Sequence, residues 1–229
     1  MNAILKQYAP HAVVILLASG ISIGVLSYNS EPQPYDIKPQ SGYSSAYYDI
    51  DPKTIQFLDD VESQTIPEED LTDLVLFNVD GRQVQLKEYV GRKNLVLVMT
   101  RGFSSSICLY CSTLTSRLIT NYPEFTNRNT EIVVVFPVSN DAERGRLDEF
   151  IAATRKNMDR PPEVIPFPVL LDVELRAVDR LGLRHDLSRP ATYILDKSGD
   201  VRFSYVGKDL SDRPSVKALL KELDLLEQG

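Results

Sequence analysis

Residues 94–122 read NLVLVMTRGFSSSICLYCSTLTSRLITNY, and this stretch decides the fold. It opens with a continuous apolar run of strand length, which is typical of a strand that is covered on both faces. From Cys108 onward, apolar residues recur at four-residue spacing and stop before Pro123, which predicts a helix that Ser105 or Ser106 can cap. The two cysteines of the chain therefore lie where a buried strand gives way to a helix.

The residues on either side predict alternating strands and helices. Around the turn at Asp80-Gly81 we expect a hairpin, and Lys197-Ser198-Gly199-Asp200 predicts a second one. The expected elements are a strand at 131–136, a helix at 142–156, a strand at 167–171, a helix at 173–181, strands at 191–195 and 201–206, and a helix at 214–226. The order is a strand-helix-strand half, whose crossover implies parallel pairing, followed by a strand-strand-helix half.

The N-terminal region predicts a membrane anchor. Residues 12–28 contain no charged side chain, and their length is near the short end of what crosses a bilayer core. Lys6 precedes this run and mostly acidic residues follow it, so residues 1–11 are expected in the cytoplasm and the bulk of the chain outside it, periplasmic or at the cell surface. A cleaved signal peptide is the alternative, because Val25 and Ser27 form a passable cleavage pair.

Composition indicates how the rest of the chain is organised and which functions are unsuited to it. Several prolines and no steady periodicity predict an extended linker at 29–66, although its tyrosines could dock on the domain, which we expect at 67–229. A net charge of −7 and a pI near 5.0, without clustered Lys and Arg, argue against a nucleic-acid surface. Two cysteines three residues apart also exclude a disulfide scaffold of the small secreted type.

The position of the cysteines predicts redox chemistry. A helix N-terminus favours a thiolate, so Cys108 is the expected attacking sulfur, and Cys111, one turn later, is the expected resolving thiol. A structural disulfide would constrain the unfolded chain little because the loop is short. Zinc would need two further ligands, and the only histidines are His11, inside the apolar run, and His185, which we expect to be structural or exposed. We expect no metal and no cofactor.

The element order, with a Cys-X-X-Cys where the first strand meets the first helix, resembles the thioredoxin fold. From about residue 70 to 225 the chain more closely resembles peroxiredoxin-like proteins of the alkyl hydroperoxide reductase and thiol-specific antioxidant family. The stretches that carry this resemblance are Asp80-Gly81-Arg82, Leu95–Val98, Arg101-Gly102, Cys108–Cys111, Pro166–Asp172 and Pro190–Gly199. It implies a three-layer α/β/α sandwich with a mixed central sheet, here preceded by a single transmembrane helix.

The resemblance also implies roles for single residues. Pro190 matches the cis-proline that faces the cysteine pair in thioredoxin-fold proteins, and Pro190, Arg189 and Thr192 are the expected substrate-binding residues. Ser105 fills the hydroxyl position of the peroxiredoxin motif. Arg101 stands where that motif has proline, and Arg189 falls one residue before the usual arginine. Arg101 or Arg189 is expected to favour the thiolate or to orient a peroxide oxygen, with surface arginines as the alternative reading.

These residues lead to three functional hypotheses, two of them enzymatic and one non-catalytic. The first is an antioxidant peroxidase, in which Cys108 attacks a hydroperoxide, Cys111 closes a disulfide, and an external thiol such as a thioredoxin-like protein resets the pair. The second is a membrane-tethered thiol-disulfide oxidoreductase that acts on protein disulfides. The third is a non-catalytic binding module that keeps only the fold.

Overall fold

The computed structural model describes residues 50–227. The predicted segments 1–11 and 12–28 lie outside the described residues, as does most of the predicted linker. Within residues 50–227, no helix is both long and apolar enough to cross a membrane.

A mixed seven-stranded sheet forms the centre of this domain, with the strand order β2-β1-β5-β4-β3-β8-β9. The strands are β1 (Val75–Phe77), β2 (Gln83–Gln85), β3 (Asn94–Met99), β4 (Thr130–Val138), β5 (Val169–Val173), β8 (Ala191–Leu195) and β9 (Val201–Val206). The β3-β4-β5 core is parallel, whereas β8 pairs antiparallel with both β3 and β9. All of β3 is buried, as its continuous apolar run predicted.

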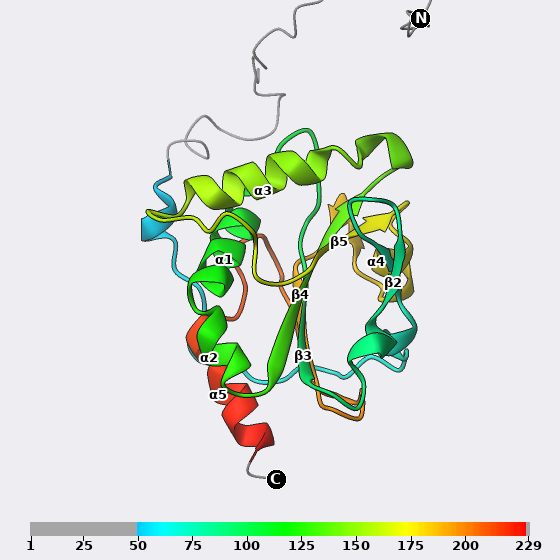
Figure 1. Ribbon diagram of the computed structural model, residues 1–229, viewed down its shortest axis with the longest axis vertical. Coiled ribbons are helices and arrows are strands. Elements are labelled where there is room, and N and C mark those ends of the chain that lie inside the picture. The colour runs from blue at the N-terminus through cyan, green and yellow to red at the C-terminus, as the bar shows by residue number, and fades with distance from the viewer. Residues whose placement is uncertain (1–49, 228–229) are drawn as a thin grey trace, which may run out of the picture. The chain divides into compact units, whose positions relative to one another are not determined.

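Helices cover both faces of the sheet (Figure 1). The helices are α1 (Leu109–Thr120), α2 (Tyr122–Thr126), α3 (Arg146–Lys156), α4 (Arg176–Arg180) and α5 (Val216–Leu226). One apolar core joins α1, α3 and α5 to the sheet, and a second core on the opposite face includes α4 and the short 3-10 helices Leu71–Asp73 and Leu86–Tyr89. The predicted three-layer α/β fold of the thioredoxin type is confirmed for this domain.

A small hairpin was not predicted. It is formed by β6 (Arg184–His185) and β7 (Leu187–Ser188), which turn at Asp186. Asp186 has a φ of 56°, in the left-handed region that Asp tolerates better than most residues. Strands of two residues are too short to show a period in the sequence, so this element had no readable signal.

Residues 52–64, which belong to the predicted linker 29–66, lie against the domain. Ile55 and Phe57 are buried in the first core, and Arg117 of α1 donates to the Ile55 carbonyl. Leu58 donates its N–H to the Arg213 carbonyl, at 2.9 Å, and accepts from the Ser215 N–H, at 2.8 Å. We call residues 52–64 the strap. Apolar side chains spaced irregularly along an extended chain explain why it reads as a linker in the sequence.

Candidate active site

Cys108 is the N-cap residue of α1. Its backbone is extended, with φ −68° and ψ 115°, and its Sγ accepts the Cys111 N–H at 3.2 Å. The expectation that Ser105 or Ser106 caps this helix is wrong, because the cysteine sulfur already takes the N–H group that a serine hydroxyl would accept. The sulfur thus lies at the positive end of the helix, as predicted.

Cys111 lies one turn into α1, and its sulfur is also held by the segment that follows β3. The Arg101 N–H donates to the Cys111 Sγ at 3.4 Å. Neither cysteine forms a disulfide, and each is only 1% exposed. The Cys108 thiol is hydrogen-bonded to the Cys111 sulfur, so the two thiols form one coupled, buried unit.

Arg213 is the functional residue that the sequence did not reveal. Its Nη2 lies 3.1 Å from the Cys111 Sγ and 3.8 Å from the Cys108 Sγ, and the residue is only 2% exposed. It belongs to the loop between β9 and α5, where its Nε donates to the Leu210 carbonyl at 2.7 Å. A buried guanidinium in contact with both sulfurs is the strongest source of positive charge in the site.

The Arg213 guanidinium lies closer to the Cys111 sulfur than to the Cys108 sulfur, and the pKa values of the two thiols shift in opposite directions. Burial raises the pKa of the Cys108 thiol well above its ordinary value, and the neighbouring Cys111 sulfur raises it further. Burial also opposes ionisation of Cys111, but the Cys108 hydrogen bond, the Arg213 charge and the Arg101 N–H together lower the pKa of Cys111 to about 6. The expectation that Cys108 carries the lower thiol pKa is therefore wrong, because Cys111 receives the Cys108 hydrogen bond and the Arg101 N–H and lies closer to the Arg213 guanidinium.

The side chains of Arg101 and Ser105 lie elsewhere than predicted. The Arg101 guanidinium forms a hydrogen-bonded ion pair with Asp186 of the small hairpin, and Ser104 donates to the same carboxylate at 2.9 Å. Ser105 is exposed and has a φ of 60°, and no hydrogen bond joins its hydroxyl to either sulfur among the described residues. Arg101 thus contacts Cys111 through its main-chain N–H and pairs its guanidinium with Asp186.

Pro190 directly precedes β8, and its peptide bond is trans, as is every peptide bond within residues 50–227. The cis-proline expectation is wrong. The Pro190 carbonyl accepts the Gly207 N–H at 2.8 Å, so the ladder between β8 and β9 continues to this residue. Thr192 is buried within β8, and Arg189 donates to the Gly182 carbonyl at 3.1 Å. No hydrogen bond joins these three predicted substrate-binding residues to the sulfurs in the described part of the chain.

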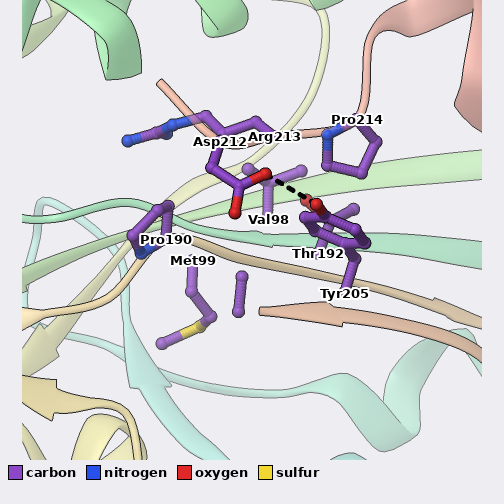
Figure 2. Close-up of a pocket in the computed structure, with 9 residues that line it drawn as sticks. Val98, Met99, Pro190, Thr192, Tyr205, Asp212, Arg213 and Pro214 are labelled. Atoms are coloured by element: carbon purple, nitrogen blue, oxygen red, sulfur yellow. Dashed lines mark hydrogen bonds between the residues drawn. The ribbon is translucent and has the colours of Figure 1, made fainter. Parts of the chain in front are cut away.

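Two hollows adjoin this region. Pro190, Thr192, Tyr205 and Arg213 line the first, which has no volume for a water molecule; there the Tyr205 hydroxyl donates to Asp212 at 2.6 Å (Figure 2). The second, of about 170 Å³, lies between Arg101, Pro190, the small hairpin and residues 208–210. His185 is exposed and lines the second hollow. No group of three or more His, Cys, Asp or Glu residues suited to a metal ion occurs among residues 50–227.

Comparison with known proteins identifies relatives of this fold. The family model described as the AhpC/TSA family matches residues 65–204, more than half of the chain. A search of the curated proteins gave no significant match. Among solved structures, a yeast mitochondrial 1-Cys peroxiredoxin has a TM-score of 0.56 at 14% identity and covers 72% of this chain and 78% of its own.

Two other solved structures show the same fold. Peroxiredoxin 6 of Arenicola marina has a TM-score of 0.55 at 14% identity, covering 72% of this chain and 74% of its own. Peroxiredoxin Q of Xanthomonas campestris has a TM-score of 0.51 at 17% identity, covering 72% of this chain and 99% of its own. Arg213 and the strap lie outside the matched residues 65–204.

Proposed function

Because the chain belongs to the AhpC/TSA family of thiol peroxidases, we propose that it reduces hydroperoxides with Cys108 as the attacking sulfur and Cys111 as the resolving sulfur. The observation that carries the proposal is the coupled pair itself: two buried thiols share a hydrogen bond, and one guanidinium contacts both. Such a pair holds one negative charge at neutral pH and can pass between dithiol and disulfide.

The first step uses Cys111 as the proton acceptor. As the Cys108 sulfur forms a bond to the terminal peroxide oxygen, the O–O bond breaks and the alkoxide leaves, to be protonated by water. The Cys108 proton moves to the Cys111 thiolate, along the hydrogen bond that already joins them. Cys111 is the thiolate of the pair at neutral pH and is therefore the proton acceptor at hand. Because its pKa lies below that of Cys108, the transfer is uphill and is completed only as the new S–O bond forms.

The second step closes the disulfide. The Cys111 thiol attacks the sulfur of the Cys108 sulfenic acid, an S–S bond forms, and water leaves with the Cys111 proton. An external dithiol, such as a thioredoxin-like protein, then reduces the disulfide through a mixed disulfide and restores both thiols. No cofactor is needed, because the two sulfurs carry both electrons that the peroxide takes.

Burial favours peroxide over a protein disulfide as the oxidant. Both cysteine residues are 1% exposed, and a thiol can attack a protein disulfide only if a large partner reaches the sulfur itself. A hydroperoxide needs only a narrow path. The observation that favours thiol-disulfide exchange is the exposed position of Ser105, which supplies no hydroxyl to the sulfurs. Exchange with protein disulfides is therefore the second candidate.

Stopped-flow peroxide consumption and reduction of insulin disulfides test these two functions. The reduced wild-type protein is expected to consume peroxide rapidly and to reduce insulin poorly. Cys111→Ser is expected to accumulate a sulfenic acid on Cys108, which dimedone traps, whereas Cys108→Ser forms none. A sulfenic acid on Cys111 in Cys108→Ser would reverse the roles of the sulfurs. Disulfide reduction without peroxide loss would replace the peroxidase, and neither activity would leave only a binding module.

We also propose that the chain is a single-pass membrane protein whose domain lies outside the cytoplasm. The uncharged run 12–28, with Lys6 before it and acidic residues after it, supports this arrangement. The full-length protein is expected in the membrane fraction at its uncleaved mass. Protease added from outside the cell is expected to digest the domain once any outer membrane or cell wall has been made permeable. A mature protein that lacks residues 1–27 and is released by salt would indicate a cleaved signal instead.

A further inference from the structure

Of the two hollows lined by the arginines that contact the sulfurs, only the one beside Arg101, of about 170 Å³, has room for a ligand. Its walls are Arg101, Pro190, the hairpin residues His185 and Asp186, and the loop residues Lys208 and Asp209, together with neighbours of these. At about 30 Å³ per water molecule, the space is roughly that of six waters. Hydrogen peroxide would occupy only part of it, whereas a carboxylate and a few methylene groups would fill it.

Arg101 connects this hollow to the sulfurs. Its N–H donates to the Cys111 Sγ, while its buried side chain forms part of the wall. Pro190 lines both this hollow and the closed one that contains Arg213. A ligand in the hollow would therefore lie against Arg101, the residue whose main-chain N–H contacts Cys111, and its reactive end would approach the sulfurs past Arg101 or Pro190.

The cationic side chains in the wall of the hollow outnumber the carboxylates, and more of the cations are able to bind a ligand. Arg101, Arg189 and Lys208 face two carboxylates, Asp186 and Asp209. Asp186 is occupied by Arg101 and Ser104. One Asp209 oxygen accepts the Ser211 N–H, the Ser211 hydroxyl and the Asp212 N–H.

Arg189 and Lys208 are the two cationic side chains of the wall that can bind an anionic ligand. Within residues 50–227, neither of them forms an ion pair, and the one side-chain hydrogen bond of Arg189 goes to the Gly182 carbonyl. A carboxylate placed in the hollow would meet these two cations without displacing an acidic partner.

We propose that this hollow binds the carboxylate of an acidic organic hydroperoxide, so that the protein prefers short carboxylate-bearing peroxides to neutral ones. The proposal rests on the peroxidase function proposed above. Arg189 and Lys208 supply the attraction, and the size of the hollow sets the length of chain between the carboxylate and the peroxide group. The same chemistry would fit a carboxylate-bearing thiol reductant, and the test separates the two.

The test uses the reduced full-length protein in detergent, with a neutral dithiol as the reductant. The substrates are a short ω-hydroperoxy carboxylate and its methyl ester, which differ only in charge. We expect kcat/KM to be about three- to tenfold higher for the acid at low salt, as a partly exposed charge contact provides, and the ratio to fall as salt is added. The double variant Arg189→Gln/Lys208→Gln is expected to bring the ratio close to one.

The control Lys197→Gln removes one exposed lysine that does not line the hollow, and it should leave the ratio unchanged. Equal rates for acid and ester in the wild type, with brisk turnover of both, would overturn this inference and leave the peroxidase intact. No turnover of either would overturn the peroxidase. A charge preference that appears only when an acidic thiol and its ester are compared as reductants would also overturn the inference, because it would assign the hollow to the reductant.

Discussion

Arg101 and Arg213 are two buried arginines beside the same pair of sulfurs, and they act through different atoms. Arg101 is 5% exposed, donates its main-chain N–H to Cys111, and turns its guanidinium to Asp186. Arg213 is 2% exposed and places its guanidinium against both sulfurs. The arginine nearest the cysteines in sequence therefore shapes the loop, while the arginine about a hundred residues away supplies the charge.

The topology explains this division. The antiparallel pairs β3-β8 and β8-β9 make β9 run parallel to β3, so the loops that follow β3 and β9 emerge at the same edge of the sheet. The loop after β9 is held tightly: Asp212 accepts from the Tyr205 hydroxyl and the Lys208 N–H. At Gly207 a Cβ would lie 2.2 Å from the Asp212 carbonyl oxygen, so a larger residue would displace this loop. Strand order thus brings Arg213 to the sulfurs, and local contacts fix it there.

The largest expected effect comes from Arg213→Gln. Loss of the guanidinium should raise the lower thiol pKa from about 6 towards its ordinary value of 9.0, since burial is then opposed only by hydrogen bonds. At neutral pH the thiolate fraction, and with it the rate of peroxide consumption, should fall about tenfold to a hundredfold. The pH dependence of alkylation and the ultraviolet absorbance of the thiolate measure the shift directly.

Arg213→Lys serves as the matched control because it keeps the charge and loses the planar fork. It should recover part of the rate and most of the pKa shift. If Arg213→Gln kept the wild-type pKa profile while Arg101→Gln raised it, the roles of the two arginines would be the reverse of those described here.

The second expected effect is a dependence of stability on pH. Cys111 ionises near pH 6 in the folded protein and near its ordinary value of 9.0 when unfolded. Its depressed pKa adds stability that grows as the pH rises from about 6 to 9 and is lost as the pH falls through 6. Above 9 the raised pKa of Cys108 acts in the opposite direction. Urea unfolding of the reduced protein should show this rise, and Cys111→Ser, with no thiolate at that position, should remove it.

Much of the fold could be predicted from the sequence because its elements have strong periods. The continuous apolar run of β3 and the alternation in β9 gave these two strands with their observed bounds, and the four-residue spacing after Cys108 gave α1 to within two residues at each end. The β6-β7 hairpin and the strap carry no such period. Their places depend on long-range contacts such as that of Phe57 with Arg117, which a local pattern cannot encode.

The candidate site was only half predictable for a related reason. The cysteine pair and its place at a helix start follow from local spacing. Arg213 lies in an Asp-Arg-Pro segment that reads as an ordinary loop before a helix, 102 residues from Cys111. The one available signal was topological: the predicted antiparallel return of 201–206 already required the next loop to lie beside the cysteines. Which side chain of that loop points to the sulfurs depends on packing.

A smaller effect is expected from Asp186→Asn, which tests the structural side of the comparison. The substitution removes the charge that holds Arg101 and Ser104, at the start of the loop leading to Cys108. Because Asp186 is half exposed, we expect the activation free energy of peroxide consumption to rise by about 1 kcal/mol, which slows the reaction roughly fivefold. The thiol pKa should move little. Asp179→Asn, which breaks an ion pair with Arg184 in which both partners are exposed, is the control and should not change the rate. A large pKa shift in Asp186→Asn would mean that Arg101 supplies charge after all.

The smallest effect concerns the strap, which holds the Arg213 main chain. Leu58→Pro deletes the N–H that donates to the Arg213 carbonyl, whereas Leu58→Ala keeps this N–H and shortens a side chain that is 40% exposed. The loss of one hydrogen bond should cost about 1 kcal/mol of stability and slow peroxide consumption less than threefold. Because the Arg213 guanidinium is also held through the Leu210 carbonyl, the thiol pKa should rise only slightly. If Leu58→Pro raised the pKa as much as Arg213→Gln, the strap itself, and with it the chain that leads towards the predicted anchor, would set the charge at the sulfurs.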